Sequence, residues 1–69
     1  MMTFGQVLKA VNSEWDFGVA NDTMDMKGNK YKTFYIINNG DVVPDYATCL
    51  AIAEYCDMRY HKGYFYKKY

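Results

Sequence analysis

The segment from Val43 to Tyr60 constrains the fold more than any other part of the chain. It runs VPDYATCLAIAEYCDMRY, with no glycine and with one proline near its start. Proline fits the first turn of a helix, where its missing N–H is not needed, and Asp45 suits the positive end of the helix dipole. Ala, Leu, Glu and Met favour the helical state. The segment therefore predicts one long helix, which ends before the glycine at position 63.

This helix is apolar on two sides. At about 100° per residue, one broad arc would face the core. The arc consists of Tyr46, Cys49, Leu50, Ile52, Ala53, Cys56 and Tyr60. The opposite stripe consists of Ala47, Ala51, Tyr55 and Met58. A helix with two apolar sides is normally covered on both. We therefore expect the stripe to contact a partner or a second copy, with the chain's own tail as the rival cover.

A shorter helix is predicted at the start of the chain. Thr3 and Gln6 have the spacing of a capping box, in which each side chain bonds the other residue's backbone N–H. Apolar residues then recur at helical spacing through residues 4–12. At this length the helix cannot be stable alone and has to pack on another element.

The middle of the chain has the period of β-structure. Residues 15–20 alternate apolar and polar side chains, as in a half-buried strand. We expect a turn at residues 21–23 and a hairpin loop at residues 27–30. Residues 31–37 form the strongest predicted strand, and apolar side chains on both of its faces indicate a central position. A second turn is expected at residues 38–41, before the long helix.

The last segment, residues 59–69, is basic and aromatic. The chain has no net charge, but residues 1–58 hold all eight carboxylates and four of the eight permanent cations. The first part is therefore acidic and the tail is basic. Interleaved Tyr and Lys side chains can form a protein interface or track a nucleic acid. Residues 64–66 could instead add an edge strand, with Lys67 and Lys68 discouraging aggregation.

The order of these elements predicts a single small α+β domain over residues 1–69. It would contain a short N-terminal helix, an antiparallel sheet of two or three strands, one long helix, and the basic aromatic tail, which adds an edge strand or docks on the sheet. A domain of this size buries only roughly 60% of its unfolded surface. Its expected stability is a few kcal/mol.

The sequence contains no catalytic or metal-binding pattern. Cys49 and Cys56 lie on one helical face about 10 Å apart along the axis, which is too far for a disulfide or one shared zinc ion. His61 stands between cations and has no nucleophile or carboxylate beside it. We therefore expect no catalytic residue, no cofactor and no metal site, and we expect that the protein is not an enzyme.

The start of the chain lacks the basic and apolar regions of a signal peptide. No apolar stretch approaches the ~20 residues of a membrane span. Two cysteines without a secretion signal fit a reducing compartment. These observations predict a cytoplasmic protein that does not bind a membrane.

Residues 2–10, MTFGQVLKA, resemble the start of a phage-borne family of small proteins that counter the Thoeris defence by sequestering its nucleotide signal. The resemblance covers only this segment, and the basic, Gly- and Trp-containing part of that family does not follow Asn12. The order of a short helix, a hairpin region and a helix is also similar to some small phage inhibitors of CRISPR nucleases. These resemblances imply an inhibitor from a mobile element, and they assign no ligand and no site residue.

The leading hypothesis is a small non-enzymatic protein-binding module, of the phage anti-defence type, that occupies a surface of a larger host protein. The alternatives are a nucleic-acid-binding protein that uses the tail and a self-associating structural protein, for example a homodimer. The partner-binding residues predicted for the leading hypothesis are Ala51, Tyr55, Met58, Arg59, His61, Lys62, Tyr64, Tyr66, Lys67 and Lys68.

Overall fold

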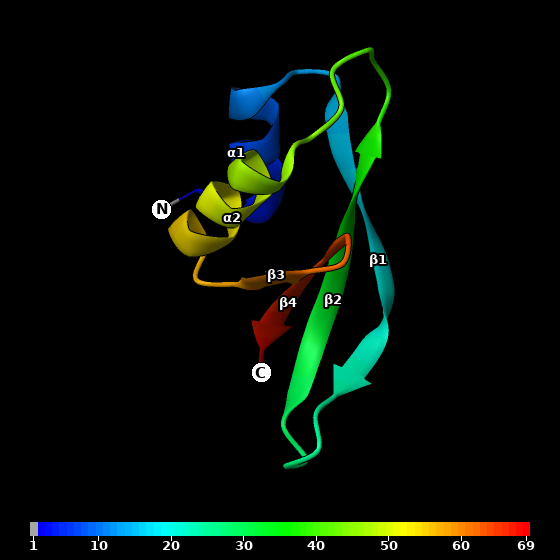
Figure 1. Cartoon of the computed structure of the whole chain (residues 1–69), viewed down its shortest axis with the longest axis vertical. Helices are drawn as coiled ribbons and strands as arrows, with labels where there is room; N and C mark the ends of the chain where they lie inside the picture. Colours follow the sequence, from blue (N-terminus) through cyan, green and yellow to red (C-terminus); the bar gives the residue numbers. More distant parts are fainter. Residues whose placement is uncertain (1) are drawn as a thin grey trace.

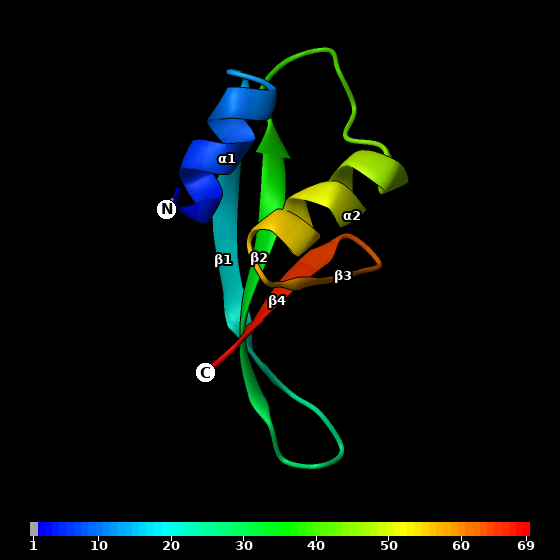
Figure 2. The same cartoon turned by 90° about the vertical axis from the view of Figure 1, so that its left-hand side faces the viewer.

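The computed structural model describes residues 2–69 as one antiparallel sheet with two helices on one of its faces (Figures 1 and 2). The elements are α1 (Phe4–Val11), β1 (Trp15–Met24), β2 (Lys30–Asn38), α2 (Tyr46–Tyr55), β3 (Arg59–His61) and β4 (Tyr64–Lys68). The strand order in the sheet is β1-β2-β4-β3. The predicted α+β class is confirmed, with four strands rather than two or three.

The capping box of α1 is present. The Thr3 hydroxyl accepts a hydrogen bond from the Gln6 backbone N–H at 3.2 Å, and the Gln6 side chain accepts one from the Thr3 backbone N–H at 2.8 Å. The helix ends at Val11, and the N–H of Asn12 closes it on the carbonyl of Leu8 at 2.9 Å. The helix buries Val7 and Leu8 against the sheet side of the domain.

The Thr3→Ala variant is expected to lose about 1 kcal/mol of unfolding free energy, because the first turn of α1 loses the acceptor for one of its N–H groups. Urea unfolding followed by circular dichroism measures this loss. Thr3→Ser keeps the hydroxyl and serves as the control, with a midpoint close to that of the wild type. An unchanged midpoint in Thr3→Ala would show that the cap contributes nothing.

The long first strand corrects the turn predicted at residues 21–23. β1 continues through these residues to Met24, and the pairing with β2 shifts its register between Ala20 and Thr23. A β-bulge accommodates extra residues without ending the strand, so the polar residues here bend β1 and do not reverse it. The hairpin reverses farther on, where Asp25 accepts a backbone bond from Gly28. β2 lies between β1 and β4, which confirms the central position predicted for it.

The second helix is shorter than predicted. It spans Tyr46–Tyr55, and Asp45 is its N-cap, with a carboxylate oxygen 2.7 Å from the Thr48 backbone nitrogen. It ends because Asp57 adopts a left-handed conformation, with φ of 55°, a common way to stop a helix. The N–H of Met58 then bonds to the carbonyl of Ala53 at 2.7 Å, and the chain continues as β3.

The predicted core arc of this helix is only partly correct. Cys49, Ile52 and Ala53 are buried, whereas Tyr46 is 67% exposed and Leu50 is 40% exposed. The difference arises because only one narrow side of α2 faces the core that it shares with the sheet. Of the remaining arc residues, Cys56 and Tyr60 pack at the border of the core.

The tail belongs to the sheet and does not cover α2. β3 and β4 form a hairpin whose two turn residues, Lys62 and Gly63, both have positive φ, 47° and 90°. Two positive φ angles are typical of the tight turns that join antiparallel strands. The glycine predicted to stop the helix therefore forms this turn. Residues 64–66 do form a strand, within β4, but the predicted edge position is wrong because β4 lies between β2 and β3. The edge on this side of the sheet is β3.

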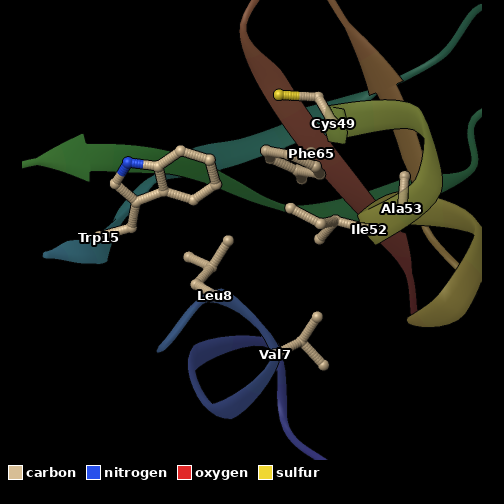
Figure 3. Close-up of a cluster of buried hydrophobic side chains, with 7 residues drawn as sticks. All are labelled: Val7, Leu8, Trp15, Cys49, Ile52, Ala53 and Phe65. Carbon is tan, nitrogen blue, oxygen red and sulfur yellow. The ribbon is translucent and has the colours of Figure 1, made fainter. Parts of the chain in front are cut away.

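The core joins both helices to the sheet (Figure 3). It contains Val7, Leu8, Trp15, Cys49, Ile52, Ala53 and Phe65. The side chain of Phe65 is fully buried, and its ring centroid lies 4.9 Å from that of Phe4 and 4.7 Å from that of Tyr60. β4 is thus fixed in the sheet by an aromatic side chain that contacts both an N-terminal and a C-terminal element.

Candidate binding surface

The other face of the sheet has no helix or strand of residues 2–69 over it (Figure 1). Phe34 of β2 and Phe65 of β4 are paired in register and face the core. Because successive side chains of a strand point to opposite faces, the residues beside them point to the uncovered side. This side carries four tyrosines on the two inner strands, with three basic residues around them. We call this set the tyrosine face, and it comprises Tyr31, Tyr35, Arg59, His61, Tyr64, Tyr66 and Lys68.

The four tyrosine rings form a continuous row. Their centroids are 6.3 Å apart for Tyr35 and Tyr64, 6.5 Å for Tyr64 and Tyr66, and 6.4 Å for Tyr31 and Tyr66. These separations lie within the range of favourable aromatic pairs. Tyr35 and Tyr64 are 37% and 43% exposed. The row is therefore ordered by contacts between the rings and still offers area to a ligand.

One glycine sets the position of the first ring in this row. Gly18 of β1 is paired with Tyr35 of β2, and the tyrosine ring lies directly over the glycine. A Cβ atom at position 18 would overlap the end of that ring. Glycine here lets the ring lie flat against β1, and a larger residue would displace Tyr35 from the row.

The basic residues lie beside the tyrosines across the strand pairs. Arg59 is opposite Tyr66, and His61 is opposite Tyr64. On the other flank, Lys68 is opposite Tyr31. The tyrosine row is therefore bordered by positive charge on the β3 side and at the end of β4.

The hairpin tip between β1 and β2 brings one carboxylate to this surface. Asp25 accepts hydrogen bonds from the backbone N–H groups of Lys27 and Asn29, from the Asn29 amide and from the Tyr31 hydroxyl. The bonds from Asn29, more than the others, hold the pKa of Asp25 below its ordinary value. A groove of about 630 Å³ runs from this tip past Tyr31 and Tyr66 to Arg59. Lys27 also lines the groove near the tip, and Asp57 lines it near Arg59, so the groove carries charges of both signs.

The other predicted tail residues do not lie on this face. Lys67 points to the helix side, where its Nζ donates to the carbonyl oxygens of Cys56 at 2.9 Å and Asp57 at 3.3 Å. It therefore caps the C-terminal end of α2. Met58 packs at the border of the core and is not on the outer stripe of the helix. Lys62 lies exposed in the β3–β4 turn.

The predicted helix residues form a second surface, away from the tyrosine face. Ala51 and Tyr55 are exposed on the outer side of α2, with Ala47 beside them. Tyr55 is 67% exposed. This side is not uniformly apolar, because Glu54 is also exposed on it. The predicted partner-binding set is thus split between two surfaces.

Sequence reasoning missed Tyr31 and Tyr35 as site residues. The sequence does indicate that these two tyrosines share one strand face, because they alternate with Phe34 and Ile36 along β2. What the sequence did not supply was the pairing of β2 with β4, which places Tyr66 opposite Thr33 and brings the two tyrosine sets together.

The two cysteines take no part in this surface. Both are free, Cys49 in the core and Cys56 at its border, and burial raises the pKa of each thiol. Within residues 2–69, no group of three His, Cys, Asp or Glu side chains is arranged to hold a metal ion. In the same part of the chain, no helix is both long enough and apolar enough to cross a membrane.

No protein-family model matches the chain, and neither curated proteins nor solved structures gave a match. These comparisons add no support to the resemblance between residues 2–10 and the anti-Thoeris family. The chemistry of the two surfaces is therefore what indicates a function.

Proposed function

We propose that the protein is a small non-enzymatic binding module that covers a surface of a larger protein with its tyrosine face. The observation that carries this proposal is the continuous row of four tyrosines on an uncovered sheet face, bordered by Arg59. Tyrosine and arginine are enriched among the residues that dominate binding energy at protein interfaces. The row also combines large contact area with few rotatable bonds.

The order already present in this surface supports tight binding for its size. Each ring contacts a neighbouring ring, and the rings project from paired strands, so little side-chain freedom remains to be lost on association. The charges are mixed, with Arg59 on the β3 side, Lys68 at the end of β4 and Asp25 at the hairpin tip. This mixture suits a protein surface of mixed polarity.

The inhibitor role is part of this proposal. A module of this size would inhibit by occupying a site on a larger protein, in the manner expected of an inhibitor from a phage or mobile element. The proposed setting is the cytoplasm, where both free thiols stay reduced. A homodimer is the alternative use of an uncovered surface, and light scattering over a range of concentrations distinguishes it.

The test compares two tyrosines on different surfaces. Tyr64→Ala should lower affinity for a captured protein partner by about tenfold or more, since truncating a central interface tyrosine often costs over 1 kcal/mol. Tyr55→Ala is the matched control, because this tyrosine is also exposed but lies on α2. Equilibrium binding is measured after equal melting of the variants is established. Loss of binding in Tyr55→Ala alone would place the interface on the helix.

Single-stranded nucleic acid is the second candidate ligand, favoured by the position of the rings on the two inner strands. Sheet modules that bind single-stranded RNA stack bases on aromatic side chains of this kind, and cations beside them contact phosphates. Anisotropy with a random-sequence oligonucleotide tests this candidate. Binding should fall steeply as salt rises, and Arg59→Gln should reduce the slope. If the protein does not bind the oligonucleotide even at low salt, single-stranded nucleic acid is ruled out as its ligand.

A further inference from the structure

A second groove lies on the helix side of the sheet, away from the tyrosine face. Its volume is about 420 Å³, and it lies between the start of α1 and the end of α2. Figure 2 shows these two helix ends on the same side of the sheet. The apolar part of the lining includes Phe4, Phe34 and Met58, all packed at the border of the core, together with Met2, Tyr55 and Cys56. The groove therefore presents an apolar wall at the surface of the domain.

Two lysines lie in this groove as direct cross-strand neighbours. Lys32 of β2 and Lys67 of β4 are paired in register. Side chains paired in this way have Cβ atoms about 5 Å apart, and like charges directly opposite each other destabilise a sheet. The pair is thus unfavourable for folding unless another group offsets the two charges.

The protein offsets these charges only in part. Lys67 bonds to the carbonyls at the end of α2, and its Nζ is 4.0 Å from the carboxylate of Asp57, a side chain that is fully exposed. The Nζ of Lys32 lies 5.7 Å from the ring centroid of Tyr69. Within residues 2–69, Lys32 has no carboxylate within 4.0 Å. One positive charge in the groove therefore lacks an acidic partner, and the other has a loosely held one.

We propose that this groove binds an anionic amphiphile, with its apolar body against Phe4, Phe34 and Met58 and its head group between Lys32 and Lys67. Small-molecule sites typically combine a mostly apolar hollow of this size with a few converging polar groups. A carboxylate or phosphate head group would neutralise both lysines and replace the exposed Asp57 carboxylate. Lys67 would keep its position, because the carbonyl bonds at the end of α2 hold it.

The site is independent of the proposed binding function, and the methionines of the chain can report on it. Met2 and Met58 line this groove, whereas Met26, fully exposed at the hairpin tip, lines only the groove at the tyrosine face, which Met58 also borders. A shift of Met58 without a shift of Met26 therefore locates the probe in the helix-side groove. Decanoate, decyl phosphate and decanol, each below its micelle-forming concentration, are titrated into the full chain labelled at the methionine methyl groups. Decanoate or decyl phosphate should shift the Met58 signal and leave that of Met26 unchanged. Whichever binds more tightly identifies the preferred head group.

Two lysine variants separate the charge from the apolar contact. Lys32→Gln should weaken binding of the anionic probe by about tenfold, as expected for loss of one charged contact, and should leave melting equal or higher because the repulsion is relieved. Lys30→Gln, an exposed lysine on the same strand outside the groove, is the control and should bind as the wild type does.

Three outcomes would overturn the proposal: no shift of Met58 with either anion at millimolar concentration, decanol binding as tightly as decanoate, or equal anion affinity in Lys32→Gln and wild type. None of them bears on the tyrosine face. A protein partner lost in Tyr64→Ala would still support the proposed function.

Discussion

A chain that ends after Lys62 is expected to remain unfolded in water. The truncation removes β4, which pairs with β2 on one side and with β3 on the other. It also removes Phe65, whose buried ring contacts Phe4 and Tyr60. Loss of a buried phenylalanine side chain alone costs about 3–5 kcal/mol. The whole stability of a domain this size is roughly 3–10 kcal/mol, so the remaining elements cannot form a stable core.

Circular dichroism and the dispersion of amide proton signals measure this result. The control is a chain that ends after Lys68 and lacks only Tyr69, which follows β4. Tyr69 contributes two hydrogen bonds, from its hydroxyl to Asp22 at 2.6 Å and from its backbone N–H to the Lys30 carbonyl at 3.2 Å. It buries no core side chain, so the control should fold and melt cooperatively. A cooperative melt of the chain ending after Lys62 would contradict the inner position of β4.

The inner position of β4 also means that truncation of the tail cannot test whether the outer stripe of α2 binds a partner. If the tail had folded over α2, unfolding after truncation would have shown that the stripe is core. Because the tail forms an inner strand, truncation unfolds the chain whether or not the stripe binds a partner. Ala51→Glu in the full chain is the informative variant, since Ala51 is exposed. It should fold normally, and any loss of association seen by light scattering would then locate a contact on α2.

The features predicted correctly from the sequence are those determined by neighbouring residues. The capping box needs only Thr3 and Gln6, and the alternation of β2 alone indicates which of its residues share a face. The end of α2 is different, because it depends on the left-handed conformation of Asp57. Residues 58–60 are compatible with either a helix or a strand, and pairing with β4 decides between them.

The candidate site likewise contains some residues that the local sequence indicates and others that only strand pairing brings to it. The basic and aromatic composition of the tail indicated a surface, and Arg59, Tyr64 and Tyr66 do lie together on the tyrosine face. Composition does not separate the two faces of a strand, however, and strand alternation sends Lys67 to the opposite side of the sheet. Tyr31 joins the site only through the register of β2 with β4, which no local pattern specifies.

The side chain of Trp15 holds the N-terminal half of the domain against the loop that leads into α2. It is 2% exposed at the start of β1, and its Nε1–H donates to the carbonyl oxygen of Val42 at 2.9 Å. Figure 3 shows it in the same cluster as Leu8 of α1. Trp15 therefore packs in the core and also fixes the irregular loop that leads into α2.

Trp15→Ala is expected to lose about 3–5 kcal/mol of unfolding free energy, because it leaves a cavity beside α1 and releases the loop at Val42. That loss is comparable with the entire stability of the domain, so the variant should be substantially unfolded before denaturant is added. Trp15→Phe retains much of the apolar volume and lacks the N–H donor, so it should lose only about 1–2 kcal/mol. Urea unfolding followed by circular dichroism separates the two effects. Equal midpoints for Trp15→Phe and wild type would show that the bond to Val42 contributes nothing. A stable Trp15→Ala variant would show that this side chain is not central to the core.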